Sequence, residues 1–111
     1  MRSDRQRLED IQTAIARIEA YGPKSCAELR DDPAAQDVAV HRLEIIGEAV
    51  SRLSFSVKAR YASVPWNQIV GMRNRMIHVY HEVDLDVVWQ VIDVELPPLK
   101  ATVEAMLKEV E

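Results

Sequence analysis

Residues 34–53 read AAQDVAVHRLEIIGEAVSRL, and this stretch decides the class of fold. Its apolar side chains recur every three or four residues, the spacing that places them on one face of an α-helix. Ile45 and Ala49 widen this face, so we expect the helix to be buried against more than one neighbour. Gly47 lowers helix stability by about 1 kcal/mol relative to Ala, which a close approach of another helix would explain. The apolar positions are Val38, Leu43, Ile46, Val50 and Leu53.

Two further helical segments precede this stretch. Apolar residues at helical spacing predict a first helix that begins at Ser3 or Asp4, either of which can cap it, and ends at Gly22-Pro23. Residues 25–28, Ser-Cys-Ala-Glu, fit the capping box of a short second helix. Asp32-Pro33 ends that helix, because the residue before a proline disfavours helical dihedral angles. The stripe of the first helix consists of Leu8, Ile11, Ile15 and Ile18.

Two main helices are expected in the second half of the chain, after a connector at residues 54–64. Pro65 suits the first turn of a helix that reaches about Tyr80, because its missing N–H does no harm there. Asp84 can cap a later helix, which Pro97-Pro98 kinks or splits before it continues to the end. The expected inward positions are Trp66, Ile69, Met72, Met76 and Ile77, then Leu85, Val88, Trp89, Ile92 and Leu96, then Leu99, Val103, Met106 and Leu107.

The composition fits one helical domain over residues 1–111. The chain is 48% hydrophobic and 29% charged, too apolar for a disordered protein. The lone Cys26 excludes a disulfide framework and a Cys-rich zinc site. No apolar run approaches the roughly 18–20 residues of a membrane span, and the charged N-terminus does not resemble a signal peptide, so a cytoplasmic location is expected. We predict an all-α fold, an antiparallel up-and-down bundle of four main helices plus short helices.

Charge is distributed unevenly along the chain. The formal net charge is −4, yet residues 38–81 carry six Lys and Arg side chains against two Glu, which makes this middle segment +4. The two acids, Glu44 and Glu48, form a stripe on the long helix that we interpret as solvated or paired with Arg52. A phosphate-containing ligand, if the protein binds one, is therefore expected at the middle segment.

Chemistry-bearing side chains concentrate in residues 71–84, GMRNRMIHVYHEVD. If the helix continues through this segment, Asn74 and His78 lie one turn apart on one face, and Arg73 and Tyr80 lie on the next. Arginine offers a fork of donors for phosphate oxygens, and histidine takes and returns a proton near neutral pH. Because the ribose 2′-hydroxyl is a nucleophile already held beside phosphorus, these groups could cleave RNA without a metal ion.

Spacing alone leaves other interpretations open. The pair Arg75 and His81 repeats the separation of Arg73 and His78 closely enough to be a second match, and an arginine at this distance from a histidine often occurs by chance. Judged individually, these residues are more often solvated or salt-bridged than catalytic. His78 and Glu82 could hold a metal ion, but two ligands without a third do not make a site. We therefore expect no metal and no cofactor.

Three blocks of sequence resemble the HepT-like ribonuclease toxins of the HEPN superfamily. They are residues 37–49, DVAVHRLEIIGEA, residues 65–74, PWNQIVGMRN, and the pattern Arg73-x4-His78-x-Tyr80. The likeness covers nearly the whole chain. The pattern selects between the two arginine–histidine pairs, because only His78 is followed by a tyrosine two residues later.

The resemblance implies a metal-independent RNA endonuclease. By position, His78 would be the acid and base, Arg73 the ligand of the phosphate and the transition state, and Asn74 the residue that orients the site. Arg75 and Arg42 are candidate RNA contacts. In this family the cleft lies between two copies of the chain, so the resemblance also implies a homodimer.

The resemblance further implies a toxin–antitoxin pair. The cognate minimal nucleotidyltransferase would use ATP to transfer AMP to the motif tyrosine, here Tyr80. An adenylate at this position would add bulk and negative charge to the cleft and repel RNA.

Two other functions compete with an RNase toxin. The chain could be a non-catalytic helical module that binds a nucleotide or docks on the nucleotidyltransferase. A DNA-binding protein is disfavoured, because neither a helix-turn-helix spacing nor a strongly basic recognition helix is present.

Overall fold

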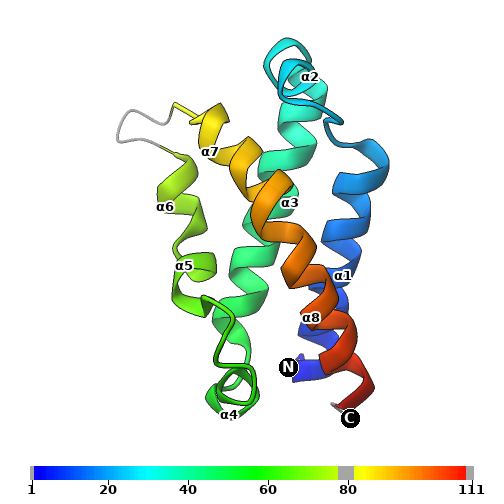
Figure 1. Cartoon of the computed structure of the whole chain (residues 1–111), viewed down its shortest axis with the longest axis vertical. Coiled ribbons are helices and arrows are strands. Elements are labelled where there is room, and N and C mark those ends of the chain that lie inside the picture. Colours follow the sequence, from blue (N-terminus) through cyan, green and yellow to red (C-terminus); the bar gives the residue numbers. More distant parts are fainter. Residues whose placement is uncertain (1, 78–81, 110–111) are drawn as a thin grey trace.

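Helix α3, Pro33–Arg52, lies at the centre of the bundle and packs against α1, α2, α5 and α6 (Figure 1). The computed structural model describes residues 2–77 and 82–109. In Figure 1 α1, α3, the segment from α4 to α6 (the third pass) and the segment from α7 to α8 (the last pass) run along the bundle one after another, and the third pass is broken into short helices. The elements are α1 Asp4–Tyr21, α2 Cys26–Asp31, α3 Pro33–Arg52, α4 Phe55–Ala59, α5 Trp66–Val70, α6 Met72–Met76, α7 Leu85–Gln90, a π-helical segment η1 Val91–Glu95, and α8 Leu96–Glu109.

Polar caps set several of these boundaries: those at Ser3, Ser25 and Asp84 are predicted from the sequence, and the one at Asp32 is not. Ser3 and Gln6 form a reciprocal capping box at the start of α1. Asp32 accepts hydrogen bonds from the first backbone N–H groups of α3, and Asp84 does the same for α7. Ser25 accepts a hydrogen bond from the backbone N–H of Glu28 at the start of α2. These polar side chains satisfy donors that a helix terminus leaves without intrahelical partners.

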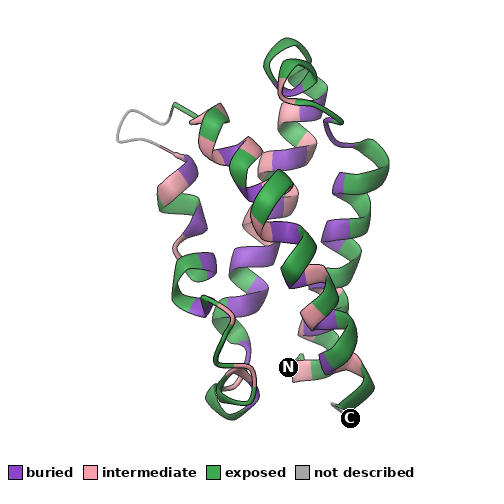
Figure 2. Cartoon of the chain, viewed as in Figure 1, coloured by how far each residue is buried: buried purple, intermediate pink, exposed green. Residues whose placement is uncertain are grey.

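The core follows most of the predicted stripes, but several positions predicted to face inward are only half-buried: Ile77, Leu85, Trp89, Ile92 and Leu107. All four residues of the predicted α1 stripe are buried, and buried positions line the inner side of each long helix (Figure 2). On α3 the small residue Ala39 is fully buried, whereas Val38, predicted to be inward, is only half-buried. The fully buried larger side chains are Leu8, Ile11, Leu29, Leu43, Ile46, Met72, Met76, Met106, Val50, Val88, Val91 and Val103.

Gly47 marks the close helix approach that the sequence predicts. A Cβ atom at this position would lie 3.3 Å from the backbone oxygen of Ile69 in α5. The missing side chain lets α5 and the following α6 lie directly on the surface of α3. The stability that glycine costs α3 as an isolated helix is thus offset by packing.

The predicted helix from Pro65 to about Tyr80 is wrong in two places. It is interrupted at Gly71, between α5 and α6, and it ends at Met76. Ile77 is extended, with φ −118° and ψ 119°, and pairs with Val83 in an isolated antiparallel bridge. A β-branched residue suits this backbone better than a helix. The helix that carries Arg73 and Asn74 therefore does not continue through Ile77, and the predicted positions of His78, Tyr80 and His81 lie outside the described residues.

The sequence predicts that Pro97 and Pro98 kink or split the last helix, whereas the structure has a π-helical segment directly before them, between α7 and α8. These prolines cannot donate to preceding carbonyl groups, and their rings crowd the turn before them. The π-helical segment η1 widens that turn. As a consequence Val91 is buried and Ile92 is only half-buried, although the sequence predicts the latter to face inward.

The all-α class is confirmed, and across residues 2–77 and 82–109 the only extended pairing is the bridge between Ile77 and Val83. The prediction of four main helices holds for α1, α3 and the last pass, whereas α5 and α6 have five residues each. In this described part of the chain, no helix is both long enough and apolar enough to cross a bilayer.

Candidate functional site

Helix α6 carries three of the predicted site residues, Arg73, Asn74 and Arg75, and Arg75 anchors the helix. Arg75 donates two hydrogen bonds to Glu95 of η1, with Nη1–Oε1 and Nη2–Oε2 distances of 2.9 and 2.7 Å. The two side chains are 27% and 21% exposed, so the pair is partly shielded from water. The hydrogen bond with Glu95 raises the pKa of Arg75 above its ordinary value. Arg75 thus ties α6 to the last pass of the chain.

Arg73 and Asn74 are exposed, and within the described residues they are uncommitted, meaning that their side chains form no hydrogen bond or ion pair. Residues two positions apart on an α-helix point about 200° apart. Because the Arg75 side chain points toward Glu95 of η1, the Arg73 side chain points away from η1. Within residues 2–77 and 82–109, neither Arg73 nor Asn74 has a side-chain hydrogen bond or an ion pair. An arginine without a carboxylate partner keeps its donors available for a phosphate.

Both residues open onto a hollow between α3 and α6. The hollow has a volume of about 270 Å³ and is walled on one side by Val70 of α5 and by Arg73 and Asn74 of α6. On the α3 side Glu44, Glu48 and Ser51 follow one another at helical spacing. Leu43 and Gly47 complete the lining. The hollow therefore places an acidic stripe opposite an arginine and an asparagine.

The predicted acidic stripe is only partly paired. Glu48 accepts a hydrogen bond from Nε of Arg52 at 3.0 Å, as the sequence predicts for this i, i+4 pair. Both of those side chains are more than 60% exposed, at 61% and 64%. Glu44 is half-buried and has no hydrogen bond or ion pair with any residue that the structure describes.

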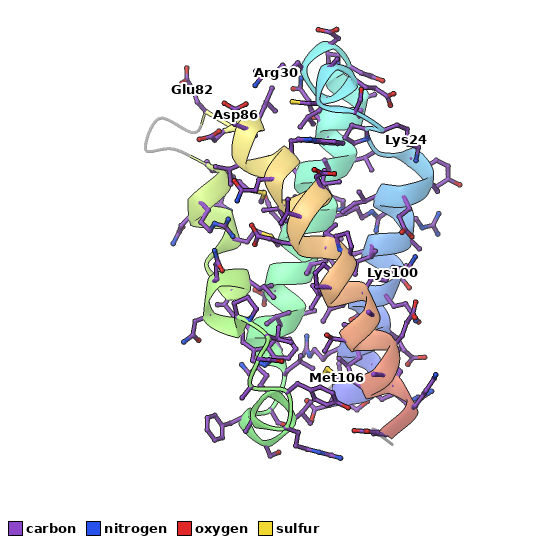
Figure 3. The ribbon with its side chains drawn as sticks, in the orientation of Figure 1. Lys24, Arg30, Glu82, Asp86, Lys100 and Met106 are labelled. Atoms are coloured by element: carbon purple, nitrogen blue, oxygen red, sulfur yellow. The ribbon has the colours of Figure 1, made fainter. Side chains whose placement is uncertain are left out.

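The segment that follows α6 is pinned at both of its ends. The backbone N–H of Asp84 donates to the carbonyl oxygen of Met76 at 2.6 Å, just outside the Ile77–Val83 bridge. On the far side, Arg30 of α2 and Asp86 of α7 form an ion pair, and Figure 3 shows these two side chains pointing toward each other. The connection from α6 to α7 therefore starts and ends at fixed positions.

The remaining predicted site residues either lie away from the hollow or fall outside the described residues. His78 and Tyr80 belong to residues 78–81, which the structure does not describe. Arg42 is half-buried on α3 and does not line the hollow beside Arg73. Its predicted contact with RNA, like that of Arg75, stays a prediction. Over the described ranges, no three His, Cys, Asp or Glu side chains cluster as metal ligands would.

Sequence reasoning missed two relationships. The partner of Arg75 lies 20 residues away, and no local signal links the two. The hollow brings Glu44 of α3 next to Arg73 of α6, although they are far apart in the chain. A signal for the second relationship existed in Gly47, which predicted a close approach at this level of α3 without naming the partner.

Fold and site together define a small all-α protein with an uncommitted arginine in the basic middle of an acidic chain. The chain belongs to the HepT-like ribonuclease family, since the family described as "Ribonuclease HepT-like" matches residues 11–106. It is 35% identical over 108 residues to a protein of Thermococcus cleftensis named probable ribonuclease HepT, covering 96% of this chain and 98% of that protein. It is 36% identical over 102 residues to a protein assigned as an RNase in Caldanaerobacter subterraneus subsp. tengcongensis, covering 92% and 88%. No solved structure matches the chain significantly.

The Arg75–Glu95 pair is expected to stabilise the fold measurably. Because the pair is bidentate and partly buried, a double-mutant cycle of Arg75→Ala and Glu95→Ala should give a coupling energy of about 1–2 kcal/mol by urea denaturation. The exposed Glu48–Arg52 pair is the matched control, and its cycle should give about 0.3–0.5 kcal/mol. Equal coupling energies for the two pairs would show that Arg75 does not anchor α6.

Proposed function

We propose that this protein is a metal-independent RNA endonuclease and the toxin of a toxin–antitoxin pair. Membership of the HepT-like ribonuclease family supports RNA as the substrate. The observation that carries the assignment of the site is the uncommitted, exposed guanidinium of Arg73, next to the equally uncommitted Asn74. The other arginine of this short helix is bound to a carboxylate, which supports Arg73 as the phosphate ligand.

The chemistry needs a base, an acid and a cationic ligand. A base removes the proton of the ribose 2′-hydroxyl, and the 2′-oxygen attacks the adjacent phosphorus. The bond to the 5′-oxygen breaks, an acid protonates that oxygen, and the products carry a 2′,3′-cyclic phosphate and a 5′-hydroxyl. His78 is the proposed acid and base, and Asn74 orients the site. Arg73 binds the phosphate and stabilises the charge that develops on its oxygens.

A homodimer with the cleft at its interface would supply these groups twice. One histidine cannot accept a proton and donate another at the same moment, whereas two symmetry-related copies can divide these roles. Two copies of the middle segment would also double its charge of +4 at one place. This concentration of positive charge would attract RNA to an otherwise acidic protein.

Neutralisation by the antitoxin would act at Tyr80. In the proposed reaction the phenolic oxygen attacks the α-phosphorus of ATP, and pyrophosphate leaves. The adenylate places a negative charge two residues from His78. It would therefore both fill the cleft and repel the RNA phosphate.

The first experiment tests cleavage itself. The purified protein is expected to cut RNA in the presence of EDTA and to leave 5′-hydroxyl and cyclic-phosphate ends. Arg73→Ala and His78→Ala should each reduce the rate about 100-fold or more. The melting temperature of Arg73→Ala should stay unchanged, because its side chain is exposed and has no partner among the described residues.

Arg17→Ala is the matched control, because Arg17 is an exposed arginine of α1. It should cleave at the wild-type rate. Wild-type cleavage by Arg73→Ala would remove Arg73 from the site. A wild-type protein that cuts no RNA but binds its nucleotidyltransferase tightly would instead support the non-catalytic module.

The second experiment tests the modification. Incubation with the cognate nucleotidyltransferase and ATP should add adenylyl mass to the wild-type protein and stop RNA cleavage. Tyr80→Phe should gain no mass, because it lacks the accepting oxygen. Tyr21→Phe is the control, since Tyr21 is 65% exposed and chemically equivalent. Modification of Tyr80→Phe to the wild-type extent would refute Tyr80 as the acceptor.

A further inference from the structure

The hollow between α3 and α6 contains a group that the proposed reaction does not use. Glu44 is a half-buried residue with no hydrogen bond or ion pair in residues 2–77 or 82–109, and it shares the hollow with Arg73. No buried side-chain oxygen of the described residues lacks a partner, so the carboxylate oxygens of Glu44 are open to solvent and can accept hydrogen bonds from a ligand. The oppositely charged Arg73 forms no ion pair with Glu44, although both side chains line one space of about 270 Å³.

The absence of an ion pair across the hollow leaves room for a ligand between the two charges. Drug-sized ligands occupy pockets of about 300–1,000 Å³, so this smaller volume suits a single planar ring system. Val70, which is 39% exposed, supplies apolar surface for one of its faces, above the buried Leu43 and Gly47. Glu44 and Glu48 supply acceptors at its edge, and Arg73 supplies donors on the other side.

The arginine and the carboxylates of the hollow favour different parts of a nucleotide. A phosphate is drawn to Arg73 and repelled by the carboxylates of α3. A base is neutral, so it can approach the carboxylates, provided that it presents N–H donors to them. Phosphate and base are neighbours in every RNA chain, as Arg73 and Glu44 are neighbours in the hollow.

The donor pattern of the bases selects one of them. Guanine presents two adjacent donor groups, N1–H and the N2 amino group, which match the two oxygens of one carboxylate. Adenine and cytosine present a single amino group on this edge, and uracil a single N–H. A carboxylate therefore discriminates in favour of guanine by the number of hydrogen bonds it accepts.

We propose that the hollow between α3 and α6 binds a guanine base next to the phosphate held by Arg73, with Glu44 as the residue that determines this specificity. The proposal rests on the proposed RNase function and adds a sequence preference to it. Glu48 is the secondary acceptor, since it is already bound to Arg52 at an exposed position. Cleavage is thereby directed to phosphates that adjoin guanosine.

Base analogues test the hydrogen bonds on the wild-type protein. Cleavage sites are first mapped on a mixed-sequence RNA, and short RNAs are then made with guanosine, inosine or 7-deazaguanosine at the preferred position. Inosine lacks the N2 amino group, so its RNA should be cut about tenfold more slowly or worse. The 7-deazaguanosine RNA should be cut at the guanosine rate, because its N1–H and N2 groups are intact.

Glu44→Gln then tests the residue. The amide keeps the shape of the side chain but replaces one acceptor oxygen by a donor, so the difference between guanosine and inosine RNAs should nearly disappear. The rate on the guanosine RNA should fall toward the rate on the inosine RNA. Glu104→Gln, at an exposed position of α8, is the matched control and should keep the full preference. Circular dichroism melting confirms that both variants are folded.

The possible results distinguish failure of the guanine site from failure of the proposed RNase function. Cleavage without enrichment at guanosine, or an undiminished guanosine preference in Glu44→Gln, would overturn the guanine site and leave the RNase intact. Sensitivity to 7-deazaguanosine rather than to inosine would also overturn it, because a different edge of the base would then be read. A wild-type protein that cuts no RNA would overturn both proposals.

Discussion

The ion pair between Arg75 and Glu95 is the interaction on which the arrangement of the site depends. Helix α6 has only five residues, and so short a helix is not stable by itself in water. Buried Met72 and Met76 hold its inner side, and Arg75 fastens it laterally to η1. Since Arg75 is fixed, the geometry of the helix directs Arg73 away from η1 and onto the hollow beside α3. One arginine serves the fold, and its neighbour is left available for a ligand.

The second constraint is the contact of α5 with Gly47. This contact places α5 and α6 directly against α3, so that residues of all three helices line one hollow. In this way a residue that destabilises an isolated helix helps to form a site. The same contact explains why an acidic stripe that the sequence predicts to be solvated or paired with Arg52 also lines the hollow with Arg73 and Asn74 of α6.

Most of the fold could be predicted because its determinants are local. Ser3, Asp32 and Asp84 cap helices within their own turn, and the stripe of α1 follows a regular period. The errors arose where local patterns compete with tertiary structure. Ile77 continues an apolar stripe but pairs with Val83. The prolines of α8 shift the register of the turn before them, and a fixed helical period cannot reproduce that shift.

The candidate site was predictable in part. The sequence pattern favoured Arg73 over Arg75 only through the tyrosine that completes it, since spacing alone could not separate the two arginines. The structure adds an independent physical distinction, because only Arg75 has a carboxylate partner within residues 2–77 and 82–109. Glu95 could not be found from the sequence, since a salt bridge across 20 residues leaves no periodic trace. The roles of His78 and Tyr80 remain predictions.

The most direct test of this account is the salt dependence of binding to an RNA whose 2′-hydroxyl groups are replaced by hydrogen, so that it cannot be cleaved. If Arg73 binds phosphate, Arg73→Gln should weaken binding. The slope of log affinity against log salt concentration should also become shallower, by about the contribution of one phosphate contact for each Arg73 that is replaced. Arg17→Gln should reproduce the wild-type slope. Identical slopes and affinities for the wild type and Arg73→Gln would contradict the central claim that Arg73 is the phosphate ligand.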